Sequence, residues 1–390
     1  FKMHWKDGTK IALRVLTFPF WLLLISIPNW IDDLIFKVQN RNFRLTRPNC
    51  IFLINSLSGK KLGPKIFAIT GKLGRGQIAF DILKDDYVQE VRKLLMQGTS
   101  VLHIIVCGGD GTVNSVIDCF EEALEEPQRD RLIYIPMALG TGNDMSRSLN
   151  ISDKVNINFM NKFFQRIDSP RTSVKLVDRW KCRVFAENTQ ELIINKSFLL
   201  YLGIGYDAET TVFFDKLRKR MPWMFRINKV NKLYYGCIFA YLLARDRLRR
   251  LRNSLLTNTL IYTKNNVIDM STYGNILILN SYSRASGIKY EWDTKREDNW
   301  VPQRIDDGKL EIMALRNWVH LSTSTARLVS PVRIAQSREF TIIVNSASTE
   351  KRPFHIDGDG IYITGSFSVD VRRIRAVKFL YYDDGVLSKF

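Results

Sequence analysis

The sequence predicts a two-domain α/β protein, in which an open α/β domain is followed by a mainly β domain. Between residues 50 and 149, short apolar runs that resemble buried strands alternate with segments of helical spacing. Beyond about residue 174, strand-like runs are interrupted only by two long helical stretches. With 390 residues and 45% apolar content, the chain can bury a core in each of two domains.

The elements of the first domain follow from apolar periodicity. The runs at 50–55 and 101–107 are rich in β-branched residues and end at Gly-containing turns, as central strands do. After the second run, apolar residues recur at helical spacing over 113–124, with glutamates on the other faces. A third strand is expected at 132–137 and a further helix at 144–149.

The second domain is predicted from a series of β-type runs without further βα alternation. Candidate strands lie at 173–185, 197–202, 255–263, 276–280, 310–314 and 340–344, and in segments after 354. The run at 377–382 is a candidate to return and pack on the first domain. We divide the chain into an amino-terminal segment (1–47), an α/β domain (48–170) and a β-rich domain (171–390).

The composition limits the classes of partner. The chain has 58 basic and 39 acidic residues, so its net charge of +19 favours an anionic partner such as a nucleotide, a nucleic acid or an acidic lipid. Its five cysteines are widely spaced and lie mostly in apolar runs, which favours buried free thiols in a reducing compartment. Four histidines and the absence of a CxxC pair exclude a zinc module in this sequence. Because it starts at Phe1, we expect it to be part of a longer protein.

An apolar segment near the amino terminus suggests membrane contact. Residues 15–31 carry no charge, but Pro19 and Pro28 interrupt the run near both ends and it is short for a spanning helix. Trp21 and Trp30 suit the headgroup layer of a bilayer. We expect an interfacial or membrane-embedded segment; a true span and an ordinary core helix remain alternatives.

A second stretch, 216–252, combines basic and aromatic residues. It holds twelve Lys or Arg residues, one acid and six aromatic residues. This composition favours binding to an anionic membrane surface. A solvated helix face is the simpler alternative, and nucleic acid is the less favoured partner.

The strongest local signal is the turn Gly108-Gly109-Asp110-Gly111-Thr112, between a predicted buried strand and an amphipathic helix. Glycines let backbone amides approach a phosphate, and the helix amino terminus attracts anions. A carboxylate beside phosphate is repulsive unless it holds Mg²⁺ or accepts a proton, so Asp110 indicates phosphoryl transfer. The plainer alternative is a turn with Asp110 as a helix cap.

Two further loops are expected at the same edge of the sheet. Residues 139–144 (LGTGND) follow the third strand and 55–60 (NSLSGK) follow the first. Strand ends of an open α/β sheet face one crevice, where ligands bind. No GxxxxGK[ST] pattern occurs, so a P-loop fold is not supported. The glycines at 71–76 are interpreted as an ordinary loop.

This ordered set of motifs resembles the diacylglycerol kinase family within the wider lipid kinase and NAD kinase superfamily. GGDGT followed by LGTGND carries the resemblance, which runs from about residue 50 to the carboxyl terminus. Further matches favour its eukaryotic branch: VDRW (177–180), LGIGYDA (202–208), NKLYYG (231–236) and PQRIDDG (302–308).

The resemblance implies an α/β half that binds ATP, a β-sandwich half, and a lipid hydroxyl that meets the γ-phosphate between them. The residues that it assigns to nucleotide binding are Asn55, Ser58, Gly59, Gly108, Gly109, Asp110, Gly111, Thr112, Gly140, Thr141, Gly142, Asn143 and Asp144. It implies Mg²⁺ near Asp110 and Asp144, and a structural Mg²⁺ at Asp307. Asp359 becomes the first candidate for the general base, with Asp357 and Asp110 behind it.

The expected activity is ATP-dependent phosphorylation of diacylglycerol to phosphatidic acid in lipid signalling, at the cytosolic face of a membrane. Two departures from the family pattern stand out. The usual NPxSGG loop reads NSLSGK at 55–60, and the usual Glu of the DGE turn is Asp359. A sphingoid or ceramide kinase, or a catalytically silent lipid-binding protein, therefore stay as alternatives.

Overall fold

The structure, a computed structural model, describes residues 45–47, 49–58, 62–70, 78–98, 100–140, 142–151, 160–221, 236–238, 240–242, 244–245, 256–264, 266–281, 283–284, 287–290, 292 and 300–383. The predicted apolar segment 15–31 and the loop 71–76 lie outside these residues, as do Gly59, Thr141 and much of the stretch 216–252.

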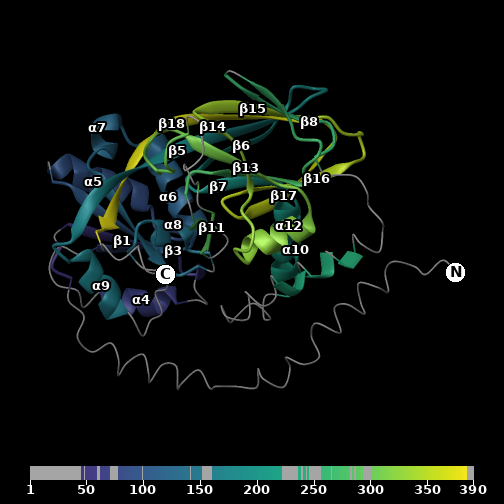
Figure 1. Ribbon diagram of the computed structural model, residues 1–390. Helices are drawn as coiled ribbons and strands as arrows, with labels where there is room; N and C mark the ends of the chain where they lie inside the picture. Colours follow the sequence, from purple (N-terminus) through teal and green to yellow (C-terminus); the bar gives the residue numbers. More distant parts are fainter. Residues whose placement is uncertain are drawn as a thin grey trace.

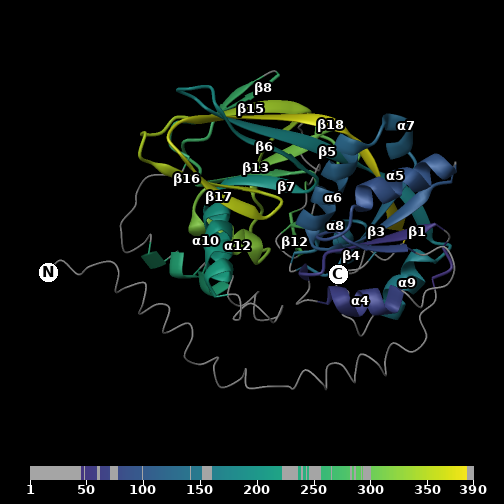
Figure 2. The same cartoon turned by 180° about the vertical axis from the view of Figure 1, so that it is seen from behind.

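The amino-terminal half is built on a parallel sheet with helices on both faces (Figures 1 and 2). Its strands lie in the order β2 (Ile78–Asp81), β1 (Cys50–Ile54), β3 (Leu102–Gly108) and β4 (Leu132–Ala138). The helices are α4 (Gly63–Thr70), α5 (Tyr87–Gln97), α6 (Asp110–Ala123), α7 (Glu126–Arg129), α8 (Asp144–Ser148) and α9 (Met160–Ile167). Every residue of β1 and β4 is buried, which explains why these strands are continuously apolar instead of alternating.

The carboxyl-terminal half is a β-sandwich. One layer is an antiparallel sheet of β14 (Val332–Ser337), β13 (Leu310–Leu315), β10 (Asn275–Leu279), β7 (Tyr201–Gly205), β16 (Lys351–Ile356) and β17 (Asp359–Thr364), in that order. The other layer consists of β5 (Thr172–Ala186), β6 (Leu192–Phe198), β8 (Thr259–Thr263), β9 (Val267–Asp269), β15 (Glu339–Val344) and β18 (Phe367–Tyr382). Buried side chains such as Trp180, Phe198 and Phe354 fill the space between the layers.

The long strand β18 joins the two halves into one sheet (Figure 1, yellow). Its first residues pair with β15, and β5 accompanies it from Phe367 to Tyr382. Near its end, Phe379 pairs in parallel with Tyr134 of β4. The prediction that the run at 377–382 returns to the first domain is therefore confirmed, and the parallel sheet continues into one layer of the sandwich.

Two helices cover the outer face of the six-stranded sheet. They are α10 (Tyr206–Arg220) and α12 (Trp318–Thr325), which lie side by side in both views. The rings of Tyr206 and Trp318 stack with their centroids 4.5 Å apart, which ties the first turns of the two helices together. Nearby, β11 (Ser283–Arg284) and β12 (Ile288–Lys289) form a short hairpin. No helix among the described residues is long and apolar enough to cross a membrane.

The predicted strand at 197–202 is wrong as a single element. Strand β6 ends at Phe198 and β7 begins at Tyr201, because the chain crosses here from one layer of the sandwich to the other. Leu199 and Leu200 form the crossing and are buried, so apolar composition alone does not reveal it. The helix predicted at 113–124 begins earlier, at Asp110, because Gly109 is its N-cap.

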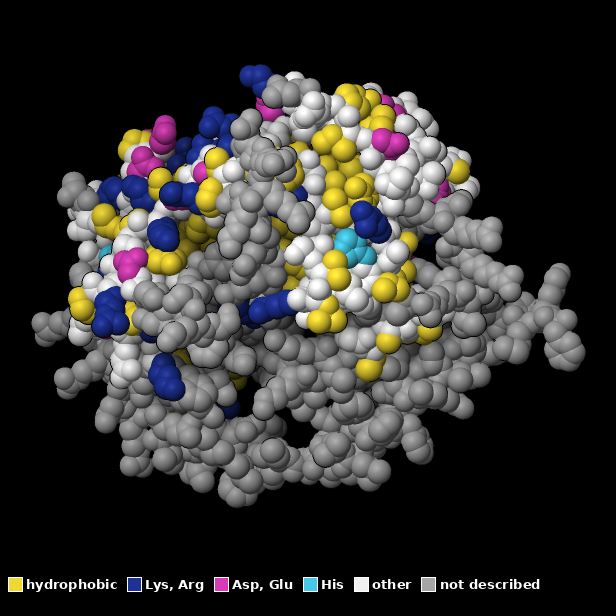
Figure 3. Space-filling model, viewed as in Figure 1, with side chains coloured by type: hydrophobic (Ala, Val, Ile, Leu, Met, Phe, Trp, Pro, Cys, Tyr) yellow, Lys and Arg dark blue, Asp and Glu magenta, His cyan; other side chains and the backbone are white. Residues whose placement is uncertain are grey.

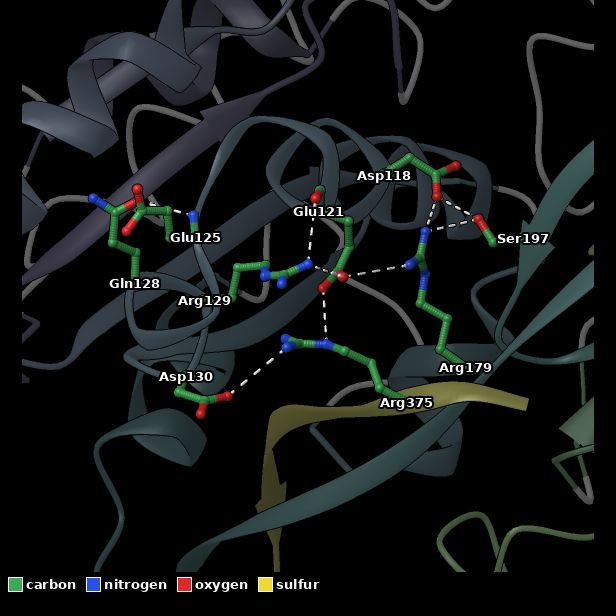
Figure 4. A network of polar contacts seen from close by, with 9 residues as sticks. All are labelled: Asp118, Glu121, Glu125, Gln128, Arg129, Asp130, Arg179, Ser197 and Arg375. Atoms are coloured by element: carbon green, nitrogen blue, oxygen red, sulfur yellow. Dashed lines mark hydrogen bonds and ion pairs between the residues drawn. The ribbon is translucent and has the colours of Figure 1, made fainter.

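A polar network anchors α6 to the shared strands (Figure 4). Arg179 of β5 has a side chain that is only 5% exposed, and it pairs with Asp118 of α6. Glu121 of the same helix accepts from Arg129 at 2.8 Å and forms an ion pair with Arg375 of β18 at 2.9 Å. Burial lowers the pKa of Arg179 to about 10. Removing one partner of such a buried network leaves an uncompensated charge, which is costly.

If β18 is a structural strand of both halves, Phe379→Ala should destabilise the whole protein. Phe379 is fully buried, and its ring lies 5.7 Å from that of Tyr134. We expect the free energy of unfolding to fall by about 3–5 kcal/mol in urea titrations. Ile374→Ala on the same strand is the control, because Ile374 is 42% exposed and should cost little. Equal effects of the two substitutions would contradict this role of β18.

Candidate active site

Two glycine-rich turns pack backbone against backbone at the carboxyl ends of β3 and β4. A Cβ on Gly140 would lie 2.7 Å from the Cα of Gly109. A Cβ on Gly108 would lie 2.5 Å from the Cβ of Thr112, in the first turn of α6. A side chain at Gly140 would therefore push the two turns apart, and one at Gly108 would displace Thr112.

The amino terminus of α6 is exposed. Among the described residues, no atom lies within 4 Å of a Cβ built on Gly111. The first loop adjoins this turn, because Asn55 at the end of β1 donates from Nδ2 to Thr112 Oγ1 at 3.2 Å. Ser58 donates its amide to the carbonyl of Asn55 at 3.0 Å. The three predicted nucleotide-binding loops therefore surround one helix amino terminus, an arrangement that suits an anion.

Asp110 connects the two glycine-rich turns. Its carboxylate accepts from the amides of Asp144 at 2.9 Å and Met145 at 3.0 Å, the first two residues of α8. Gly142 lies so close that a Cβ there would be 3.0 Å from Asp110 Oδ2. The carboxylate is thus fixed in position before any ligand binds.

Asp144 is fully buried and reaches the second half of the chain. Its Oδ1 accepts from Ser283 Oγ at 2.9 Å and from the amide of Gly287 at 3.0 Å. Arg147, one turn later in α8, lies 3.5 Å from the same oxygen. The β11–β12 hairpin is thereby docked onto α8.

Asn143 precedes α8 in the left-handed conformation, with φ of 56°. Its Nδ2 donates to the carbonyl of Gly140 at 2.8 Å, which closes the loop. Its Oδ1 is buried and accepts no hydrogen bond from the described part of the protein. A buried acceptor without a donor is a candidate ligand contact.

Asp357 comes from the opposite side, in the two-residue turn between β16 and β17. Asp357 and Gly358 have φ of 47° and 84°, as a tight hairpin of this hand requires. The carboxylate accepts from the amides of Leu199, Leu200 and Tyr201, each at 3.0 Å. The hairpin is therefore held against the crossing between β6 and β7.

The three carboxylates bring negative charge together, although Arg147 lies beside Asp144 and Lys196 acts on Asp357. Burial, together with the nearby charges of Asp144 and Asp357, raises the pKa of Asp110 to about 7. Burial also raises the pKa of Asp357 to about 6, although its backbone hydrogen bonds and Lys196 oppose the shift. Asp110 and Asp357 belong to different halves of the chain, and the effect of one charge on the other indicates that they lie near each other where the halves meet.

The structure separates the two acids that the sequence proposed as general base. The Asp359 side chain is 61% exposed and forms an ion pair with Lys196 on the surface. The charge of Asp357 acts on Asp110, whereas Asp359 begins β17 and is exposed. Of the two candidates for the base, Asp357 is therefore the one that lies near Asp110.

Asp307 lies at a second place, apart from Asp110 and Asp144. It lines an open pocket of about 600 Å³ together with Val301, Pro302, Arg304, Asp306 and Lys309. Among the described residues, no donor reaches its buried Oδ2, and the same is true of Oε2 in neighbouring Glu311. Burial raises the pKa of Glu311 to about 8, and the charge of Asp307 adds to the shift. Lys309 is the positive charge that opposes the raised pKa of Asp307.

Several residues of the site could not be predicted from local sequence patterns. Ser283 and Gly287 contact Asp144 across 139 and 143 positions. Lys196 lies on β6 and has no distinctive sequence pattern around it. It reaches the site only because the β16–β17 hairpin folds against β6. Glu311 is fully buried within an otherwise apolar strand, which is the one irregularity that could have drawn attention to it.

Comparison with known families gives two matches. The family described as "Diacylglycerol kinase catalytic domain" matches residues 49–170, and the family described as "Diacylglycerol kinase accessory domain" matches residues 197–360. The first contains both glycine-rich turns, and the second ends just beyond Asp357.

Curated relatives agree with these matches. The chain is 29% identical to diacylglycerol kinase 2 of Arabidopsis thaliana, over 80% of this chain and 43% of the relative. It is 25% identical to diacylglycerol kinase theta of Mus musculus, over 80% of this chain and 33% of the relative. The chain thus spans less than half the length of these relatives.

Among solved structures, one from Bacillus anthracis, proposed to be a diacylglycerol kinase, resembles this fold. The TM-score is 0.52 with 16% identity, over 87% of this chain and 98% of the other. This likeness supports the arrangement of an α/β half followed by a β-sandwich. The two family matches, with the curated relatives beside them, show that the chain belongs to the diacylglycerol kinase family.

Proposed function

We propose that the protein transfers the γ-phosphoryl group of ATP to the free hydroxyl of diacylglycerol, which gives phosphatidic acid. The observation that carries this proposal is the meeting of carboxylates from both halves: Asp110 and Asp144 from the α/β half, and Asp357 from the β-sandwich half. A kinase needs a nucleotide side and an acceptor side that face each other, and this cleft supplies both.

On the nucleotide side, the turn from Gly108 to Thr112 and the loop from Gly140 to Asp144 would hold the phosphates. Their glycines allow close approach of backbone, and the open amino terminus of α6 favours negative charge. The unsatisfied Oδ1 of Asn143 would accept from a donor group of the nucleotide. Asn55 and Ser58 would complete the loop edge.

Asp110 and Asp144 fit a divalent cation. Burial and, after it, the charge of Asp144 raise the pKa of Asp110, and a cation would relieve the repulsion between the two carboxylates. Among the described residues, no three His, Cys, Asp or Glu side chains form a metal-binding group. One or two carboxylates plus phosphate oxygens is the usual mode for Mg²⁺. Mg²⁺ held there would neutralise charge on the phosphoryl group during transfer.

On the acceptor side, Asp357 would be the general base. The lipid hydroxyl donates its proton to the Asp357 carboxylate while its oxygen bonds to the γ-phosphorus, and the bond between that phosphorus and the ADP oxygen breaks. Three backbone amides hold the carboxylate in place, so it needs no rearrangement during the reaction. A pKa of about 6 leaves it ionised at neutral pH.

Asp307 and Glu311 fit a second, structural Mg²⁺ site, away from the transfer site. Their buried oxygens without donors in the described part of the chain, and the pKa of Glu311 at about 8, point to a missing cation. We propose that a cation here holds the loop 301–309 to β13, whose side chains include Glu311.

We place the reaction at the cytosolic face of a membrane, where the lipid substrate resides. The last turn of α10 carries Arg218, Lys219 and Arg220, which suit an anionic surface and belong to the basic stretch 216–252.

The activity is tested by transfer of labelled phosphate from Mg-ATP to diacylglycerol, sphingosine and ceramide in mixed detergent micelles. Label in phosphatidic acid supports the proposal. Label only in sphingoid lipids would keep the site and change the substrate. If protein that binds Mg-ATP labels no lipid, the lipid-binding alternative replaces the kinase.

The assignment of the base predicts different effects for two neighbouring acids. Asp357→Asn should lower kcat by about 10²–10⁴, because the amide cannot take the hydroxyl proton. Asp359→Asn, two residues away, should keep near-normal turnover, because Asp359 is exposed and contacts Lys196. Steady-state kinetics on diacylglycerol micelles measure both. A severe loss in Asp359→Asn with normal turnover in Asp357→Asn would reverse the assignment.

The pKa of Asp110 predicts how stability depends on pH. The folded protein holds this proton up to about pH 7, whereas the unfolded chain loses it near pH 3.8. The stability that the protonated Asp110 contributes is therefore fully present below about pH 4 and is lost as the pH rises through 7. Asp110→Asn stays neutral at every pH. Between pH 5 and pH 8, the melting temperature of the original protein without ligand should therefore fall relative to that of Asp110→Asn.

Thermal melts of both proteins at several pH values provide the measurement, since all other carboxyl groups are common to the two. The same substitution should remove transfer activity. If the difference in melting temperature between the two proteins does not change with pH, the pKa of Asp110 is not raised.

A further inference from the structure

The segment that follows α12 presents apolar side chains to solvent. Every residue from Thr325 to Ser330 is exposed. Leu328 is 76% exposed and Val329 51%, and Leu328 is the most exposed of the large hydrophobic residues in the described part of the chain. We call residues 325–330 the α12 tip. Exposed adjacent apolar residues on a fixed loop point to a binding role.

The backbone of the tip turns Leu328 outward. Arg327 has φ of 61°, the left-handed conformation that glycine usually supplies at the end of a helix. Its amide donates to the carbonyl of Ser324 at 3.0 Å, and that of Leu328 donates to Thr323 at 2.8 Å. In this motif the residue at the Leu328 position normally packs on an apolar residue at the Thr323 position. Thr323 offers no such surface, so Leu328 stays in solvent.

The tip is also held in a fixed shape. The amide of Arg316 donates to His320 Nδ1 at 3.2 Å. His320 therefore carries its proton on Nε2, which lies 3.1 Å from the Ser330 carbonyl and donates to it. This bridge clamps both ends of the segment that contains α12 and the tip. A fixed apolar loop loses little conformational entropy when it binds.

The charge around the tip is of one sign. Residues 316–338 contain four arginines and no aspartate or glutamate. Arg316 and Arg327 are exposed. Figure 3 shows hydrophobic and basic side chains together on the surface over α12. An apolar point with a cationic rim complements an anionic bilayer, whose interface takes up both kinds of group.

We propose that the α12 tip docks the protein onto anionic membranes. Leu328 and Val329 insert among the lipid headgroups, and Arg327 and Arg316 contact lipid phosphates. This inference rests on the proposed function in that the substrate is a membrane lipid. Two adjacent side chains are too small a surface for a stable protein interface of about 1,000 Å² or more, whereas they suffice for shallow insertion.

The position of α12 relative to the carboxylates agrees with this role. Trp318 at the start of α12 stacks on Tyr206, the residue after β7. At the other end of β7, Tyr201 donates its amide to Asp357. Strand β7 therefore connects the start of α12 with the turn that carries Asp357, so the tip and Asp357 belong to the same half of the chain.

The test compares vesicle binding of full-chain variants. Leu328→Ser/Val329→Ser should lower the partition coefficient on phosphatidylcholine vesicles that contain phosphatidylserine by about tenfold or more. Leu83→Ser/Met96→Ser is the matched control, because these residues of the α/β half are 52% and 72% exposed. The control should bind like the original protein. Equal losses in both pairs, or none in the tip pair, would overturn the proposal.

Arg327→Gly separates docking from folding. Glycine accepts the left-handed conformation, so the melting temperature should stay the same or rise by about 2 °C. Removal of the guanidinium should weaken binding to phosphatidylserine vesicles about threefold to tenfold and leave binding to neutral vesicles almost unchanged. If binding is unchanged on anionic vesicles, or if the variant melts lower, the tip is structural and the inference fails.

Failure of the docking proposal and failure of the proposed kinase function can be told apart by measuring phosphate transfer to diacylglycerol in detergent micelles. The tip variants should keep the micelle activity of the original protein. If the original protein binds vesicles through the tip but phosphorylates no lipid, the docking proposal stands and the kinase proposal fails. Tip variants that bind vesicles normally but lose self-association in light scattering would make the tip a protein interface, against the proposal.

Discussion

The pairing of β18 with strands of both halves is the constraint on which the rest of the structure depends. Strand β18 and its partner β5 extend from one layer of the sandwich to the edge of the α/β sheet, where β18 pairs with β4. A shift of one half against the other would break this pairing. Arg179 and Arg375, on these two strands, then fix α6 through Asp118 and Glu121. The amino terminus of that helix carries Asp110, so the sheet fixes the position of Asp110 relative to the β-sandwich half.

The carboxylates of the cleft are held mainly by backbone amides, not by side-chain cations. Asp110 accepts two amides and Asp357 accepts three. Each amide hydrogen bond lowers the pKa of its carboxyl group, but burial outweighs these bonds, so both pKa values stay raised. Burial likewise outweighs the hydrogen bond from Gln336 at Glu311, beside Asp307. The amides therefore serve mainly to fix the positions of the carboxylates.

Local sequence pattern could predict the strand-turn-helix units and both glycine-rich turns, because these depend on neighbours in the chain. It could also single out Asp110, since a carboxylate is unusual in a phosphate loop. It could not place Ser283 against Asp144, nor choose between Asp357 and Asp359, because both questions depend on how distant strands pair. The strand expected at 197–202 failed for a related reason: the chain changes sheets within a uniformly apolar run.

The shared strand also has a consequence for the order in which the chain can mature during synthesis. The edge of β4 is completed by a residue pair, Tyr134 and Phe379, that is far apart in the sequence. Until β18 leaves the ribosome, the nascent α/β half exposes an unpaired edge strand with an entirely apolar sequence. Such long-range pairing folds slowly. We therefore expect the amino-terminal half to need chaperones during synthesis. Its sheet is complete only when β18, almost the last segment of the described chain, has been made.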